Sequence, residues 1–328
     1  MKETQIETAK TYFVKYNGIY FLSSRDDEPH EMLEILTMDE FIALYNSDPR
    51  YMQEYFNVID KNQVLATKKL DIEQESAELP FGIYTANLAP RGFFLEPTKF
   101  NFDQYLDLQS EVITQLVAHI RRFVEAKDIY ARFGLLHKRG ILLYGPPGNG
   151  KTMLINHLVN RYMNQAYVIR IKNLVVIDYL TKIRPLFKGK LTIFILEEIT
   201  QETQSRDCNI LLEFLDGPNS WDDCIIIATT NYPEMLPGNI VNRPSRFDLV
   251  LKIDNPSEAV RRRYLEELLG VYPEEIVALT KDRSLAFLKE LCVQSLLNQQ
   301  NIIDAYYHYH KIQEDIKMRF IPPAGEFV

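Results

Sequence analysis

The sequence predicts an α/β protein, with a parallel sheet flanked by helices, a helical region after it and a small α+β domain before it. Three observations carry this prediction. Helical segments alternate with short apolar stretches from about residue 99, a glycine-rich loop joins one such stretch to a helix, and the pattern is helical after about residue 254. Strands separated by helices favour βαβ units and a parallel sheet. We therefore expect domains at residues 1–97, 98–254 and 255–328.

The first 97 residues are expected to form the small α+β domain. Residues 11–24 contain an Asn-Gly pair between two apolar runs, which is a strong hairpin signal. Residues 37–47 predict a helix, because a threonine and a glutamate have the spacing of a capping box. A second helix is expected at residues 49–59, and residues 70–84 predict a loop followed by a strand.

Five short strands are expected in the parallel sheet. Each is a short apolar run, and helical stretches separate the runs. The predicted strands are residues 140–145, 166–171, 191–196, 224–229 and 249–253. The later helical region opens at residues 256–270, where a proline suits a first helical turn and a glycine suits a C-cap.

Composition and charge narrow the classes of function. The chain has 328 residues, of which 46% are hydrophobic and 25% charged, as in an ordinary globular protein. Residues 1–97 hold 9 basic and 17 acidic residues, whereas the remainder holds 28 of each, so the whole net charge of −8 lies in the first domain. This distribution argues against nucleic-acid binding, which needs a basic surface. Because no apolar run suits a membrane span or a signal peptide, we expect a cytoplasmic protein.

The glycine-rich loop is the clearest functional signal. Residues 145–152, GPPGNGKT, follow a predicted strand and precede a helical stretch, which is the context that the motif G-x-x-x-x-G-K-[ST] requires. Its glycines let backbone N–H groups surround phosphate oxygens. We expect Lys151 to neutralise the β and γ phosphates and the Thr152 hydroxyl to hold Mg²⁺. The sequence thus predicts a site for a nucleoside triphosphate.

Polar residues at the ends of two later strands complete a hydrolysis site. The strand at residues 191–196 runs into Glu197 and Glu198. We assign Glu197 to the metal and Glu198 to orienting and polarising the attacking water. Asn231 follows the strand at residues 224–229, where it can hold the water or the γ-phosphate.

These residues resemble the AAA clade of the AAA+ ATPases. The motifs that carry the resemblance are residues 102–106, 138–152, 211–217, 228–236, 242–248 and 283–292. Together they cover roughly residues 99–310. Within the clade, residues 123–152 look most similar to the branch that includes the mitochondrial chaperone of the Rieske iron–sulfur protein.

The resemblance implies a P-loop AAA+ module, with a five-stranded parallel sheet and a C-terminal helical lid. It implies that ATP and Mg²⁺ bind at the subunit boundaries of a homo-oligomeric ring, usually of six. Arg243 and Arg246 match the family's arginine fingers, which stabilise charge on the transferring phosphoryl group in the neighbouring site. The residues expected to bind nucleotide are Asp103, Tyr105, Gly145, Pro146, Pro147, Gly148, Asn149, Gly150, Lys151, Thr152 and Met153.

Three positions depart from the family's pattern. Where the family has an aromatic-hydrophobic-glycine pore loop, this chain has Val-Val-Ile at residues 175–177. Either the loop is altered, with Tyr179 as its aromatic, or residues 173–180 are a core helix, as their apolar density favours. Leu285 replaces a lid glycine close to the nucleotide, and Thr200 stands where an acidic residue often follows the acidic pair.

Three hypotheses of function follow. The first is an ATPase ring that remodels or translocates a protein client, with residues 1–97 binding the client. The second is an ATP-gated interaction module, in which nucleotide binding assembles a regulatory or defence complex. The third, a nucleic-acid loader or remodeller, is disfavoured by the charge distribution.

Overall fold

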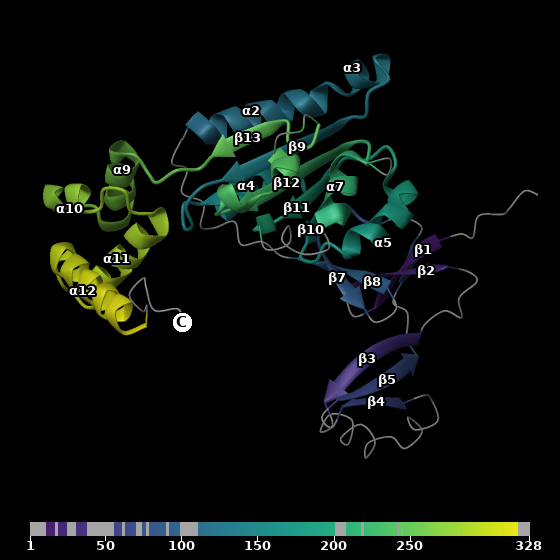
Figure 1. Cartoon of the computed structure of the whole chain (residues 1–328), viewed down its shortest axis with the longest axis horizontal. Coiled ribbons are helices and arrows are strands. Elements are labelled where there is room, and N and C mark those ends of the chain that lie inside the picture. Colours follow the sequence, from purple (N-terminus) through teal and green to yellow (C-terminus); the bar gives the residue numbers. More distant parts are fainter. Residues whose placement is uncertain are drawn as a thin grey trace, which may run out of the picture.

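The structure is a computed structural model. It describes residues 11–16, 19–24, 31–37, 56–60, 63–69, 74–76, 79–89, 92–98, 111–200, 208–217, 220–241, 243 and 245–320. Figure 1 shows how their helices and strands are arranged.

A parallel sheet forms the centre of the fold. Its strands are β9 (Lys138–Tyr144), β10 (Tyr167–Ile171), β11 (Thr192–Leu196), β12 (Cys224–Thr230) and β13 (Leu249–Lys252). They lie in the order β13-β9-β12-β11-β10, and every neighbouring pair is parallel. β11 and β12 are buried along their whole length, which explains their continuous apolar runs. All five predicted strands are confirmed.

Helices cover both faces of this sheet. They are α2 (Glu111–Glu125), α3 (Lys127–Arg132), α4 (Lys151–Tyr162), α5 (Val176–Ile183), α7 (Cys208–Asp216) and α8 (Gly238–Val241), with short 3-10 turns at Arg184–Phe187 and Pro233–Met235. Successive residues of a strand point to opposite faces. Val168 and Ile193 therefore pack with α2 and α4, whereas Ile169 and Phe194 pack with α5 and α7.

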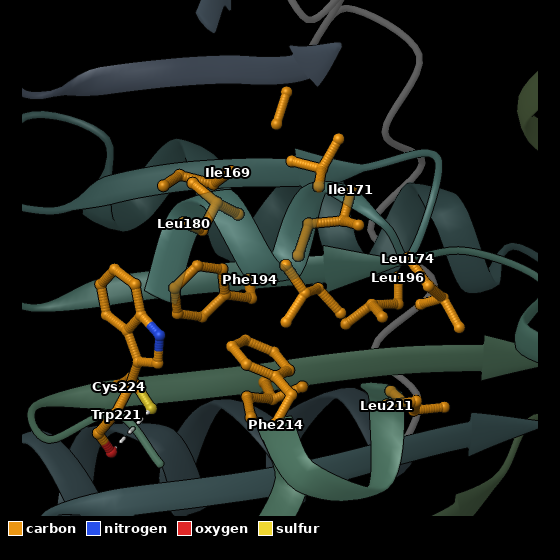
Figure 2. Packing of buried hydrophobic residues seen from close by; sticks show 14 of the residues in the cluster. Ile169, Ile171, Leu174, Leu180, Phe194, Leu196, Leu211, Phe214, Trp221 and Cys224 are labelled. Atoms are coloured by element: carbon orange, nitrogen blue, oxygen red, sulfur yellow. Dashed lines mark hydrogen bonds between the residues drawn. The ribbon is translucent and has the colours of Figure 1, made fainter. Parts of the chain in front are cut away.

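Aromatic side chains fill the face that α5 and α7 cover. The ring centre of Phe194 lies 5.0 Å from that of Phe214 on α7 and 4.8 Å from that of Trp221, both edge-on. Figure 2 shows these three rings together beneath Leu180 of α5. Each such pair contributes about 0.5–1.5 kcal/mol beyond the burial of area. This packing holds α7 against β11, and α7 carries Asp216 at its end.

The sheet continues beyond β10 into the N-terminal part of the chain. β7 (Gly82–Ala89) pairs with β10 in parallel, from Tyr167↔Gly82 to Ile171↔Ala86. The strands that follow, each antiparallel to its neighbour, are β8 (Gly92–Pro97), β2 (Ile19–Ser24), β1 (Thr11–Tyr16) and β6 (Gln74–Ser76). Over the described part of the chain, the sheet therefore has ten strands, five more than predicted. A sequence shows which runs are apolar, but it does not show which sheet edge accepts a further strand.

Among the described residues before Glu111, all regular elements are strands. β1 and β2 pair from Thr11↔Ser24 to Tyr16↔Ile19, which confirms the predicted hairpin. A second sheet has the strand order β3 (Glu31–Thr37), β5 (Gln63–Lys69) and β4 (Phe56–Asp60).

Two predictions in this region are corrected. The helix expected at residues 49–59 is wrong over residues 56–59, which lie in β4 and pair with β5. Pairing with a neighbouring strand outweighs the local helical pattern there. β6 lies within the stretch that was predicted as a loop at the start of residues 70–84. The helix expected at residues 37–47 lies outside the described residues, except for Thr37, which ends β3.

A helical lid follows the sheet. Its helices are α9 (Glu258–Leu269), α10 (Glu274–Leu279), α11 (Leu285–Leu297) and α12 (Ile302–Phe320). They share a core of their own around Leu265, Ile276 and Leu288, and Figure 1 shows them grouped beyond the end of β13. Ser257, rather than the preceding proline, caps α9, and Gly270 ends it with a φ of 71°. Among the helices of the described ranges, none combines the length and the apolarity needed to cross a bilayer.

Candidate nucleotide-binding site

The phosphate loop links β9 to α4. Gly150 is the N-cap of α4 with a φ of 86°, a conformation that a side chain would disfavour. At Gly145, an added Cβ would lie 2.1 Å from the Ile253 carbonyl oxygen, so only glycine fits. These constraints explain why the motif needs glycine here. The loop residues therefore stand at a helix N-terminus, a position that favours phosphate binding.

Lys151 lies at the centre of this loop. It is buried, and its Nζ donates hydrogen bonds to the carbonyl oxygens of Gly145, at 2.6 Å, and Pro146, at 3.0 Å. Burial lowers the pKa of the Lys151 ammonium, and the nearby charge of Glu198 partly offsets this effect. The loop thus holds a cation next to Glu198, as a site for an anionic ligand requires.

Thr152 and Glu197 place two oxygen donors side by side. The Thr152 hydroxyl donates to Glu197 Oε1 at 2.9 Å, which joins the start of α4 to the residue after β11. Arg170, near the end of β10, contacts Glu197 Oε2 through its Nη2 at 3.2 Å. Hydroxyl and carboxylate oxygens are ligands that Mg²⁺ accepts, so this donor set fits the metal that the family implies. Among the described residues, no group of three or more His, Cys, Asp or Glu suggests another metal site.

Glu198 is held by the residues that end β12. Its backbone φ is 53°, in the left-handed region. Its N–H donates to Thr229 Oγ1 at 3.0 Å, and the Asn231 N–H lies 3.1 Å from each carboxylate oxygen. The Asn231 side chain also donates to the carboxylate. Glu198 and Asn231, expected from the sequence to act on one water, therefore lie in direct contact.

The two arginines matched to arginine fingers have different environments. Both contact Asp216 Oδ2, Arg243 Nε at 3.1 Å and Arg246 Nε at 2.9 Å. The side chain of Arg243 is 64% exposed, whereas that of Arg246 is 6% exposed and also donates to the Asn239 carbonyl. Arg243 is the one of the pair with a side chain open to solvent.

The lid contacts the phosphate loop directly. The Asn149 amide donates to Asn255 Oδ1 at 2.8 Å and accepts a hydrogen bond from the Leu285 N–H at 3.2 Å. The Ala286 N–H donates to the Gly148 carbonyl at 2.9 Å. The N-terminus of α11 therefore rests on the loop, and Leu285, where the family has glycine, makes its contact through the backbone.

The stretch matched to the pore loop is largely core. Val176 and Ile177 are buried in α5, which confirms the core-helix interpretation for these residues. Tyr179 is half-buried, and its ring centre lies 5.8 Å from that of Phe93 on β8. Within residues 172–180, the exposed residues are Lys172, Asn173 and Asp178.

The structure brings together most of the predicted site. Lys151, Thr152, Glu197, Glu198 and Asn231 meet at the carboxyl ends of β9, β11 and β12. Met153 is half-buried beside Gly150, and Pro147 is exposed on the loop.

Two of the predicted residues are not among the described ones, and some residues of the site were not predicted. Asp103 and Tyr105 lie outside the described residues. Sequence reasoning missed Arg170, Asp216 and the pair Thr229-Thr230. Only the position of that pair, next to Asn231 at a strand end, was a usable signal.

The fold and the site define a P-loop nucleotide-binding domain. Residues 141–255 match the family described as ATPase family associated with various cellular activities (AAA). The chain therefore carries an AAA ATPase domain, as the resemblance of its motifs implied.

Several curated proteins are similar to the chain. Protein HYPER-SENSITIVITY-RELATED 4 of Arabidopsis thaliana is 31% identical over 193 residues, which are 49% of this chain and 32% of that protein. The probable mitochondrial chaperone bcs1 of Schizosaccharomyces pombe is 27% identical over 244 residues, 68% of this chain and 53% of that protein. A Bifidobacterium animalis protein named AAA ATPase forming ring-shaped complexes is 24% identical over 252 residues, 66% and 48% of the two chains. The chain thus spans about half or less of the length of these relatives.

Proposed function

We propose that this chain binds ATP with Mg²⁺ and hydrolyses it. The observation that most supports the proposal is the meeting of Lys151, the Thr152–Glu197 pair and the Glu198–Asn231 pair at one edge of the sheet. This edge, at the carboxyl ends of parallel strands, is where open α/β sheets bind ligands. The AAA family match supports the same assignment.

Each residue has a defined task in this reaction. The loop N–H groups and Lys151 bind the β and γ phosphates, and Thr152 and Glu197 would hold the metal, which supplies charge neutralisation when bound. Glu198 accepts a proton from the water whose oxygen attacks the γ-phosphorus, while the bond to the β-phosphate oxygen breaks. Asn231 holds the Glu198 carboxylate and orients the water.

The test compares two variants. Glu198→Gln keeps the shape of the side chain but removes its basicity, so it should bind ATP and release little phosphate. Lys151→Ala should lose binding, because it removes the buried cation of the loop. Nucleotide binding is followed with a fluorescent ATP analogue and turnover by phosphate release. Unchanged turnover in Glu198→Gln would contradict the proposal.

We further propose a homo-oligomeric ring, of six subunits, in which Arg243 completes the neighbour's site. Its exposed side chain supports this role, whereas Arg246 is buried against Asp216. The name of the Bifidobacterium relative, which forms ring-shaped complexes, supports the assembly. Light scattering of Glu198→Gln with and without ATP should detect a discrete oligomer. A monomer under both conditions would contradict the ring.

The proposed role of the ring is to remodel a protein client that residues 1–97 bind, in the cytoplasm. A specific observation favours an ATP-gated interaction module as the second candidate, since Val176 and Ile177 are buried where a gripping loop is expected. The two are distinguished by a pull-down from native cells with Glu198→Gln, compared with Lys151→Ala. Many proteins retained only by Glu198→Gln would favour a remodeller, and one partner at fixed stoichiometry would favour the module.

A further inference from the structure

Glu198 adopts a backbone conformation that its own side chain does not favour. A φ of 53° is costly for a residue with a Cβ, and such residues persist where the surroundings hold them in place. The Asn231 N–H and side chain supply part of this support. Thr229 Oγ1, which accepts the Glu198 N–H, supplies another part. A further part requires a contact that fixes residues 197–200 against residues 230–232.

Two buried threonines make that connection. Thr200 is 3% exposed and Thr230 is 0% exposed, and their hydroxyl groups are hydrogen-bonded to each other. Thr200 follows Glu198 by two residues, whereas Thr230 ends β12 directly before Asn231. The pair therefore ties the segment just after Glu198 to the end of β12, directly before Asn231.

The other partners of Thr230 indicate which of the two hydroxyl groups donates the hydrogen bond. Thr230 Oγ1 accepts the Tyr232 N–H at 3.0 Å and lies 3.5 Å from Glu198 Oε1. A hydroxyl has one proton and two lone pairs. If Thr200 donates, Thr230 accepts from two groups and turns its own proton toward the carboxylate. This assignment is favoured, because a hydrogen bond to a charged group is the stronger kind.

We propose that Thr200 and Thr230 are positioning residues that hold the Glu198 carboxylate through a chain of two hydroxyl groups. The inference deepens the proposed ATPase function and rests on it. It also gives a role to Thr200, which stands where the family often has an acidic residue. A carboxylate at position 200 would accept the Thr230 proton and withdraw it from Glu198.

Kinetics test the chain of hydroxyl groups. Thr200→Val keeps the shape but removes the donor, so we expect kcat to fall about 10-fold with KM for ATP unchanged, as for other residues that orient a reacting group. Thr200→Ser should restore kcat, because it keeps the hydroxyl. Thr192→Val is the matched control, since Thr192 is 1% exposed at the opposite end of β11. A kcat of Thr200→Val equal to that of the control would overturn the proposal.

A second measurement does not depend on turnover. Hydrogen exchange of the Asn231 and Tyr232 amides, without nucleotide, should speed up in Thr200→Val and not in Thr200→Ser or Thr192→Val. Unchanged exchange would overturn the proposal even if the protein hydrolyses no ATP. Conversely, faster exchange together with full activity in Glu198→Gln would retain the threonine contact and reject the proposed role of Glu198.

Discussion

At the scale of single residues, Asp223 joins its own segment before β12 to α3 and to His137. Its carboxylate contacts Lys127 Nζ of α3 at 2.7 Å and His137 Nδ1 at 3.0 Å. The other ring nitrogen of His137 faces the Phe123 carbonyl at 2.8 Å. Burial alone would raise the pKa of Asp223, but the hydrogen bonds from Lys127 and His137 outweigh it and lower the pKa below its usual value. The group therefore stabilises the fold in its charged form.

Asp223→Asn should destabilise the protein by about 2 kcal/mol at neutral pH, because it removes the charge that pairs with the buried His137. Asparagine tolerates the φ of 53° at this position, so the backbone is kept. Lys127→Ala should cost only about 0–1 kcal/mol, because the side chain of Lys127 is half exposed. Urea unfolding followed by fluorescence measures both.

The stability difference between the original protein and Asp223→Asn should depend on pH. Since the folded pKa of Asp223 is lowered, its contribution is complete above the ordinary value of 3.8 and is lost as the pH falls through the folded value. The free energies of unfolding of the original protein and Asp223→Asn should therefore converge in acid. A constant difference from pH 7 down to the acid limit would contradict this account.

Arg170 forms an ion pair with Glu197 and so restricts the position of its carboxylate. Support of this kind matters more for a glutamate than for an aspartate, because the glutamate side chain is one methylene longer. Arg170→Gln should weaken the Mg²⁺-dependent part of nucleotide affinity about 10-fold, because Glu197 Oε2 loses its partner. Adding Glu197→Asp should recover part of the loss, since the shorter side chain needs less support. Titration of a fluorescent nucleotide with and without Mg²⁺ measures this, and Arg184→Gln, which loses a contact to the Ser220 carbonyl, is the control. If Arg170 instead repels the metal, Arg170→Gln would strengthen the dependence on Mg²⁺.

At the scale of elements, the contact between the phosphate loop and the lid holds two parts of the fold together. Asn149 joins the loop to α11 through the Leu285 N–H and to the segment before α9 through Asn255. Asn149→Ala would remove both hydrogen bonds, to the half-buried Leu285 N–H and to Asn255 Oδ1, at a cost of about 0.5–1.5 kcal/mol for each to the docking of the lid. We expect faster hydrogen exchange at the start of α11 and faster release of bound nucleotide. Asn156→Ala on α4 is the control, because the Asn156 Oδ1 has no partner among the described residues.

Some elements could be predicted from the sequence and others could not. The core strands, such as β11 and β12, were predictable because strands buried on both faces must be continuously apolar. β4 was not, since its pairing with β5 depends on a neighbour rather than on its own pattern. The resemblance placed Leu285 near the nucleotide, but its direct contact with Asn149 was not predicted, because the two residues are 136 positions apart and neither residue type indicates the other.

In the candidate site, too, some residues could be predicted from the sequence and others could not. The proximity of Lys151, Thr152 and the two glutamates could be predicted, because their spacing and their place after a strand carry chemical meaning. Position 200 was noted as a departure, but its contact with Thr230 was missed, because two common residues gain their proposed role only where their segments meet. Sequence motifs thus point to the groups proposed to react more readily than to the groups proposed to position them.

At the scale of the whole molecule, the ring can be tested by mixing two inactive variants. Arg243→Ala keeps Glu198, and Glu198→Gln keeps Arg243, so a site formed between them has both residues. Equal mixing should restore about a quarter of the original rate if subunits assemble at random in a closed ring. Phosphate release measures this, and a mixture of Arg243→Ala with Lys151→Ala should behave similarly. Mixtures as inactive as their components would show that each subunit is independent of its neighbour's arginine.

The parallel pairing of β7 with β10 also has a mechanical consequence. A pull along β7 loads its backbone hydrogen bonds to β10 together, in shear, whereas the lid joins the sheet through the segment after β13 and its contacts with the phosphate loop. In a single-molecule stretching experiment with handles on β7 and on α12, the lid should detach at low force, before the β7–β10 junction separates. We therefore expect a force applied to the N-terminal strands to reach β10. Arg170 lies near the end of β10, where it contacts Glu197, one of the groups proposed to hold the metal.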